Sequence, residues 1–128
     1  MIQPQGLHII AELSGCNSEK IGDEAFVKQA LTEAAHHANA VICELSFHKF
    51  SPSGISGVVV IAESHLSIHT WPELGYAAID IYTCGEHTKP EMASSYLAEI
   101  FDATSVRVMK IERGLKDEAG VYSHRIGD

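Results

Sequence analysis

Residues 57–62 read GVVVIA, and this run decides how the surrounding chain is expected to fold. Consecutive β-branched residues are typical of a strand, and a run that is apolar at every position is typical of a strand covered on both faces. Upstream of it, residues 41–47 alternate apolar with polar side chains, and residues 52–54 read PSG, a turn sequence. These segments together predict a β-hairpin whose second arm is a central strand.

The same reasoning extends outward to the other elements. Residues 7–13 and 76–83 alternate in the manner of strands with one covered face, and residues 106–111 predict a last strand before a polar tail. Residues 23–39 carry apolar positions at the spacing of one helical stripe. Residues 88–91 read TKPE, which has capping-box spacing and a proline inside the first turn, so a second helix is predicted to begin there.

These elements predict one α+β domain spanning residues 1–128. Two helices on one face of a mostly antiparallel sheet make a two-layer sandwich, because each element must bury its single apolar face. A chain of 128 residues is long enough for one core and too short for two. The other face of the sheet also needs a cover, and a second copy of the chain supplies one, so we expect a homodimer.

Composition excludes several classes of protein. The net charge of -8 argues against nucleic-acid binding, which needs clustered basic residues. The chain contains neither an apolar run long enough to span a membrane nor a signal-peptide core near its start, so we expect a cytoplasmic protein. Three scattered cysteines, Cys16, Cys43 and Cys84, predict reduced thiols rather than disulfides.

Ionisable and polar side chains crowd into the segment between residues 62 and 76, which we interpret as a functional loop carried by the sheet. Cys84 ends the next predicted strand, and Gly85 permits a sharp exit from the sheet. Serine, histidine and cysteine side chains are therefore expected to meet at one end of the sheet. The polar residues of the segment are Glu63, Ser64, His65, Ser67, His69, Thr70, Trp71 and Glu73.

The long run FHKFSPSGISGVVVIAESHLSIHTWPELGYAAIDIYTCG, residues 47–85, resembles the prokaryotic S-adenosylmethionine decarboxylases. The resemblance extends from GLHIIAEL, residues 6–13, to about residue 113. A lone Glu-Ser-His would be a weak signal, but ESHLSIHTWPE followed at the matching distance by TCG is a long pattern without gaps. The chain is therefore identified by its sequence as similar to that family.

The resemblance implies that the chain is a proenzyme that cuts itself between Glu63 and Ser64. Residues 1–63 would then form a β chain and residues 64–128 an α chain. Ser64 would become a covalent pyruvoyl cofactor that forms a Schiff base with S-adenosylmethionine. The implied products are carbon dioxide and decarboxylated S-adenosylmethionine, the aminopropyl donor of spermidine biosynthesis.

The resemblance also implies roles for individual residues. His69 and Ser56 match the residues that assist processing, His69 as the proton acceptor, and Cys84 matches the catalytic proton donor. Phe50 matches the ring that stacks on adenine, and Glu73 matches the carboxylate that holds the ribose hydroxyls. The implied assembly is a homodimer of processed chain pairs with shared active sites, and residues 3–7 offer no second aromatic ring for adenine.

The residue numbers raise one geometric conflict. Positions 64 and 69 have opposite parity, so in one regular strand their side chains would point to opposite faces of the sheet. For Ser64 and His69 to cooperate, the segment cannot be one regular strand, and a bulge, a turn or a strained residue is expected between them. Regular pleating from Ser64 through His69 would count against that cooperation.

Two other functions compete with this interpretation. The same self-processed scaffold could decarboxylate free arginine or ornithine, although the presence of both Phe50 and Glu73 favours an adenosyl substrate. Alternatively, the chain could be a noncatalytic metal- or ligand-binding homologue, since His65 and His69 have the spacing of a helical metal pair. Their β-branched surroundings argue against a helix there, so we expect no metal.

Overall fold

The computed structural model describes residues 3–127, and within them seven strands form one antiparallel sheet. The strand order is β2-β3-β4-β5-β1-β6-β7. The strands are β1 (Gly6–Ser14), β2 (Ile42–Lys49), β3 (Ile55–Ile61), β4 (Ser64–Trp71), β5 (Tyr76–Cys84), β6 (Ser105–Lys116) and β7 (Tyr122–Gly127). The helices are α1 (Ser18–Ile21), α2 (Glu24–His37) and α3 (Pro90–Ile100), and η1 (Pro72–Leu74) is a 3-10 turn.

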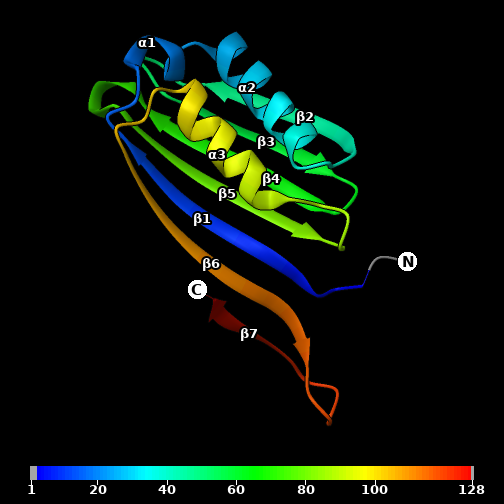
Figure 1. The fold of residues 1–128 in the computed structure, drawn as a ribbon. Coiled ribbons are helices and arrows are strands. Elements are labelled where there is room, and N and C mark those ends of the chain that lie inside the picture. The colour runs from blue at the N-terminus through cyan, green and yellow to red at the C-terminus, as the bar shows by residue number, and fades with distance from the viewer. Residues whose placement is uncertain (1–2, 128) are drawn as a thin grey trace.

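All the helices lie on one face of the sheet, which confirms the predicted α+β two-layer architecture (Figure 1). The helix α1 is a single turn that the sequence pattern did not predict. The β6–β7 hairpin projects past the end of the other strands (Figure 1). Within residues 3–127, no helix combines the length and apolar character needed to cross a membrane.

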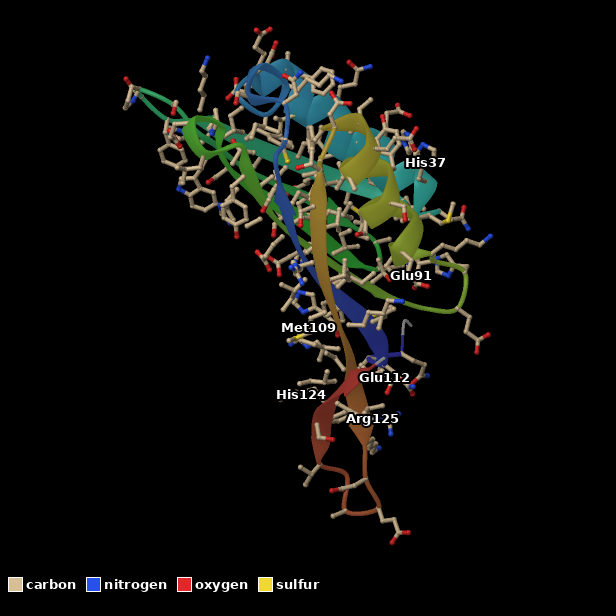
Figure 2. The ribbon with its side chains drawn as sticks, turned by 60° about the vertical axis from the view of Figure 1, so that its left-hand side comes forward. His37, Glu91, Met109, Glu112, His124 and Arg125 are labelled. Carbon is tan, nitrogen blue, oxygen red and sulfur yellow. The ribbon has the colours of Figure 1, made fainter. Side chains whose placement is uncertain are left out.

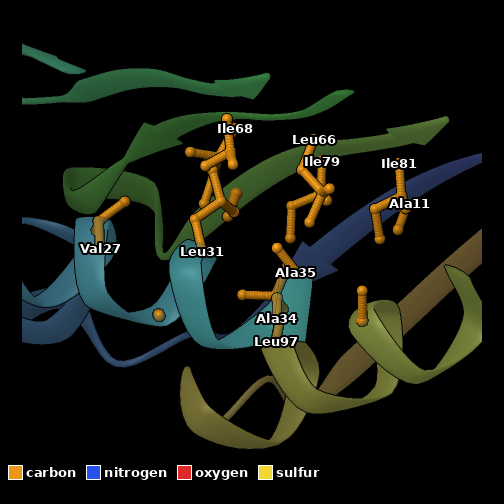
Figure 3. Packing of buried hydrophobic residues seen from close by; sticks show 14 of the residues in the cluster. Ala11, Val27, Leu31, Ala34, Ala35, Leu66, Ile68, Ile79, Ile81 and Leu97 are labelled. Atoms are coloured by element: carbon orange, nitrogen blue, oxygen red, sulfur yellow. The ribbon is translucent and has the colours of Figure 1, made fainter. Parts of the chain in front are cut away.

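The core lies between the two long helices and the inner strands (Figure 3). Leu66 and Ile68 of β4 and Ile79 and Ile81 of β5 point from the sheet towards the helices. The facing stripe of α2 consists largely of alanines, which are small enough to let the helix backbone approach the sheet closely. Burying each aliphatic side chain contributes about 1.5–3 kcal/mol, so this layer stabilises the whole arrangement. The alanines of α2 and its C-cap in the core are Ala30, Ala34, Ala35 and Ala38.

The two helix starts differ in how they are capped. At α2, the predicted helix is confirmed, and the Asp23 carboxylate accepts a hydrogen bond from the Phe26 amide at 3.2 Å. At α3, the predicted helix is also confirmed, but the predicted capping box is wrong. The Thr88 hydroxyl instead contacts Thr83 Oγ1 and the Gly85 carbonyl, both at 3.0 Å, because the chain before the helix turns back towards β5.

The polar segment interpreted as a loop is in fact strand β4, and the loop prediction was wrong. Its alternate residues Leu66, Ile68 and Thr70 are buried against the helices, while His69 and Trp71 face the opposite side. Polar residues on the solvent side of a half-buried strand produce this alternation. The polar crowding in the sequence therefore marks one face of a strand.

Two further strand predictions need correction. The strand β3, which contains the GVVVIA run, lies second from the sheet edge, and its Val60 is 39 % exposed on the face away from the helices. It is covered on one face within this chain, and not on both as predicted. The segment predicted as a polar tail instead forms β7, which pairs with the end of β6.

The face of the sheet away from the helices, called here the open face, has no cover within the described part of the chain. Cross-strand pairing puts Ser56, His69, Ala78 and His8 on this face. Met109 of β6 and His124 of β7 also lie on the side away from α3 (Figure 2). The open face is rich in histidine and aromatic side chains, which distinguishes it from the aliphatic face beneath the helices.

Packing of α3 on the sheet can be tested with two substitutions in that helix. Leu97 has no exposed surface, whereas Met92 is 50 % exposed. We expect Leu97→Ala to lower the free energy of unfolding by about 3 kcal/mol, because it leaves a cavity in the core. Met92→Ala, the matched control, should change it by less than about 0.5 kcal/mol. Urea denaturation measures both values, and equal effects would contradict the packing described.

Candidate active site

Ser64 begins β4 directly after the tight turn at Ala62 and Glu63. Its partner in the ladder is Ile61, so the turn joins β3 to β4 through these two residues alone. Ser64 has a φ of 144°, in the positive range that favours glycine. A serine held there stores backbone strain, on the order of 1–3 kcal/mol. The strain lies next to the peptide bond at which the sequence resemblance implies cleavage.

The carbonyl on the other side of that bond is also held in place. The backbone amide of Cys84, at the end of β5, donates a hydrogen bond to the Glu63 carbonyl oxygen at 3.0 Å. The Cys84 side chain is 8 % exposed, and its thiol lies 3.6 Å from the Pro4 carbonyl oxygen. The structure therefore brings Ser64 and Cys84 together, as predicted, and adds a backbone donor aimed at the carbonyl between them.

Ser56 and His69 form a second polar pair. They are directly opposite each other on β3 and β4, and Ser56 Oγ lies 2.8 Å from His69 Nδ1. The hydrogen bond orients the imidazole and leaves its other nitrogen free to exchange a proton. This pair faces the open side of the sheet.

Phe50 and Glu73 lie near that pair, at the end of the sheet opposite Ser64. The Ser53 hydroxyl donates to Glu73 Oε2 at 2.6 Å, which ties the β2–β3 turn to η1. Phe50 is 47 % exposed, and its ring lies 4.6 Å, centroid to centroid, from that of His48 in an edge arrangement. An accessible aromatic ring and a carboxylate on neighbouring turns can together hold a flat, hydroxyl-bearing ligand.

The two groups are separated by the length of β4. This strand pairs with β3 and β5 from Ser64 to Trp71 without a register shift, so the predicted irregularity between Ser64 and His69 is absent. Five residues of strand correspond to roughly 17 Å. Within one chain, therefore, Ser64 and His69 do not meet, and the expectation that serine, histidine and cysteine gather at one end was wrong for His69. The strain is at Ser64 itself.

The chain is similar to known proteins along most of its length. The family model described as S-adenosylmethionine decarboxylase matches residues 7–114. The S-adenosylmethionine decarboxylase proenzyme 2 of Halalkalibacterium halodurans is 52% identical over 110 residues, which cover 86% of this chain and 87% of that protein. The S-adenosylmethionine decarboxylase proenzyme of Thermodesulfovibrio yellowstonii is also 52% identical, over 120 residues, with 94% and 84% covered.

The chain belongs to the S-adenosylmethionine decarboxylase family. A solved structure agrees with this assignment. The crystal structure of the adenosylmethionine decarboxylase from Aquifex aeolicus matches with a TM-score of 0.84 and 37% sequence identity, covering 91% of this chain and 96% of that one. The two-layer fold is thus the fold of a solved adenosylmethionine decarboxylase.

His65 is the residue near Ser64 that sequence reasoning missed. In this S-adenosylmethionine decarboxylase family member, His65 Nδ1 lies 3.3 Å from Ser64 Oγ. Among the described residues, no other imidazole makes a hydrogen bond to Ser64. Burial, with His8 nearby, lowers the pKa of His65, and Asp80 opposes that effect. The position of His65 directly after Ser64 is the feature of the sequence that could have predicted this contact.

That spacing does not make a metal site. His65 and His69 are four residues apart on an extended strand, which corresponds to roughly 13 Å. Two imidazoles at that separation cannot both ligate one zinc ion, which needs bonds of about 2 Å. The described residues contain no cluster of three or more metal-binding side chains.

A pocket of about 530 Å³ lies beside the β6–β7 hairpin. It is lined by Pro4, Tyr82, Arg113 and Tyr122 among others, and Arg113 stacks on the Tyr82 ring at 4.5 Å. Burial raises the pKa of Tyr82, and the neighbouring Cys84 thiol raises it further. The Tyr82 phenol therefore stays protonated beside the thiol.

Titration of His65 tests the environment of Ser64. We expect the His65 imidazole, followed by NMR, to take up its proton at a lower pH than an ordinary histidine side chain does, because burial disfavours the cation. His8→Gln should raise the His65 pKa, and Asp80→Asn should lower it.

The same shift predicts how stability depends on pH. The folded state binds fewer protons at His65 than the unfolded state does, so the contribution of His65 is full above about pH 6.5. It is lost as the pH falls through the lowered pKa of the folded state. A His65 pKa at or above the ordinary histidine value of about 6.5 would contradict the burial described.

Proposed function

We propose that this chain is a proenzyme that cleaves itself between Glu63 and Ser64 and then decarboxylates S-adenosylmethionine with the resulting pyruvoyl group. The observation that carries the proposal is the strained Ser64, whose hydroxyl follows a carbonyl held by the Cys84 amide. Cleavage would divide the domain into residues 1–63 and 64–128. Membership in the S-adenosylmethionine decarboxylase family supports this substrate over free arginine or ornithine.

The first step is an attack of Ser64 Oγ on the Glu63 carbonyl carbon. A base takes the hydroxyl proton, and the carbonyl oxygen gains negative charge that the Cys84 amide stabilises from 3.0 Å. One such donor is typically worth about 3 kcal/mol. The C–N bond then breaks, its nitrogen takes a proton, and an ester links Glu63 to Ser64. Within the same chain, Ser56 lies on β3 opposite His69, at the end of β4 that is far from Ser64.

The second step is β-elimination from the ester. A base removes the Ser64 α-proton, its electrons form the Cα–Cβ double bond, and the Cβ–O bond breaks. Glu63 leaves as a carboxylate that keeps the oxygen. The remaining dehydroalanine tautomerises to an imine, and water replaces ammonia to leave the ketone. His69 is suited to act as the base, because histidine side chains commonly serve as general bases and the Ser56 hydroxyl orients this imidazole from 2.8 Å.

His69 of one chain is too far from Ser64 of the same chain, so we propose that the base comes from a second copy. If the open faces of two copies pack together about a two-fold axis lying across the strands, the strands of the two copies run in opposite directions. The Ser64 end of one sheet then lies over the His69 end of the other. Each of the two sites would combine Ser64 and Cys84 of one chain with Ser56, His69, Phe50 and Glu73 of its partner.

The residues present fit the proposed substrate chemistry. The pyruvoyl group supplies a ketone next to an amide, which acts as the electron sink for decarboxylation. Phe50 offers a face for adenine and the sulfonium cation, worth about 1–2 kcal/mol when desolvated, and Glu73 offers acceptors for the ribose hydroxyls. The exposed Trp71, stacked on Tyr76 at 5.1 Å, adds an aromatic surface at the same end. Cys84 would deliver a proton to the substrate carbon.

Self-cleavage is tested by mass spectrometry of the purified protein. Wild-type protein should yield fragments 1–63 and 64–128, the second labelled by a carbonyl reagent, and should release carbon dioxide from S-adenosylmethionine but not from arginine or ornithine. Ser64→Ala should stay intact because it lacks the nucleophile. Ser67→Ala, the next serine on β4, is the matched control and should be cleaved. An intact wild-type chain without a reactive carbonyl would refute the proposal.

The shared site is tested by co-expressing two inactive variants, Ser64→Ala and His69→Ala. Each alone should remain uncleaved. In a mixed dimer, the His69→Ala chain contributes Ser64 and its partner contributes His69, so one of the two sites is complete. We expect cleavage of the His69→Ala chain only, detected by the mass of a tag on that chain. No cleavage in the mixture would show that both residues must come from the same chain.

A further inference from the structure

Glu63 holds a buried carboxylate directly before the proposed cleavage site. The residue is only 6 % exposed. Its Oε2 accepts a hydrogen bond from His87 Nε2 at 2.6 Å, and its Oε1 lies 3.4 Å from the Val41 amide. Since a carboxylate only accepts, the His87 proton must be on Nε2. A buried acid with this short contact is fixed in one orientation.

His87 is itself fixed by the loop between β5 and α3. Asn39, just after α2, donates from its side chain to the His87 carbonyl at 2.8 Å, and the Lys89 amide donates to the Ala38 carbonyl at 2.8 Å. Gly85 has a φ of 96°, and a Cβ added there would approach the His87 ring to 3.0 Å. The absence of a side chain at Gly85 thus leaves room for the imidazole, and the two hydrogen bonds fix the backbone of the loop to the end of α2.

The end of β5 and the loop that follows it therefore contact Glu63 at two points. The Cys84 amide holds the Glu63 main-chain carbonyl at 3.0 Å, and His87 holds the side chain. Two contacts on opposite ends of one residue restrict its rotation, which a single hydrogen bond to the carbonyl would not do. The orientation of this carbonyl decides whether the Ser64 hydroxyl can attack it. A misplacement of about 1 Å can cost about a hundredfold in rate.

We infer that His87 is a positioning residue for self-cleavage that acts through the Glu63 carboxylate, an inference that rests on the proposed function. The His87 N–H fixes the carboxylate and offsets its negative charge, which otherwise lies on the residue whose carbonyl becomes an oxyanion. Removing His87 leaves a buried carboxylate without its closest donor, so Glu63 turns towards water and the carbonyl moves away from the Cys84 amide. His87 touches neither the substrate nor the bond that breaks.

The test is the rate of self-cleavage of newly made precursor, followed by electrophoresis. His87→Ala should slow cleavage by about ten- to a hundredfold. In a Glu63→Gln background, which removes the charge, the added effect of His87→Ala should shrink to less than about threefold. His36→Ala is the matched control, because His36 also faces a glutamate, Glu33 at 3.8 Å, but on an exposed helix surface. It should cleave at the wild-type rate.

Added imidazole gives a readout that a merely structural role would not change. The His87 side chain is 53 % exposed and lines a cavity of about 730 Å³, so free imidazole can reach the vacated space. It should restore cleavage of His87→Ala several-fold and leave Ser64→Ala intact. His87→Gln, which keeps an N–H donor, should cleave faster than His87→Ala. If the alanine variant does not fold, the cleavage rate of His87→Gln is compared with that of the wild type instead.

The outcomes separate this inference from the proposed function. Wild-type precursor that never cleaves overturns both. Wild-type cleavage with an equal rate for His87→Ala overturns the role of His87 alone. The role of His87 is also overturned if His87→Ala cleaves slowly, imidazole does not restore its rate, and the rate falls by the same factor in the Glu63→Gln background. That pattern marks general damage to the fold.

Discussion

The hydrogen bond from the Cys84 amide to the Glu63 carbonyl joins the β3–β4 turn to the end of β5, and the geometry of the site depends on it. It aligns one carbonyl beside a serine whose φ of 144° strains the backbone. The antiparallel pairing of β4 with β5 brings Thr83 opposite Ser64, so the amide of the next residue reaches the turn. A regular sheet thereby holds an irregular residue in place, and the core beneath the helices supplies the stability that offsets the strain.

The open face of the sheet connects fold and function. In a two-layer domain the helices cover one face only, and the other presents His69, Trp71 and their neighbours. These side chains are too polar for a core and too aromatic for an ordinary solvent surface, which suits a face that meets a second copy around a ligand. Ser64 and His69 are roughly 17 Å apart within one chain. The site shared between two chains that we propose accounts for this separation.

Much of the fold could be predicted from periodicity. Helix α2 and strands β1, β2, β3 and β5 lie within a few residues of their predicted ranges, because their apolar patterns have the helical or strand period. Strand β4 was missed, since its polar face was interpreted as a loop. The capping box before α3 failed because the Thr88 hydroxyl bonds back to the preceding loop, a choice set by tertiary contacts.

The sequence by itself determined the two-layer class, the family resemblance and the chemical types of the site residues, because these depend on local pattern and residue identity. The tertiary structure decided which of those residues meet. It placed Ser64 with Cys84 and Ser56 with His69, and it revealed His65 and His87, since strand register and loop closure depend on pairing between distant segments. Periodicity along a chain carries no information about such pairing, which arises only when the sheet forms.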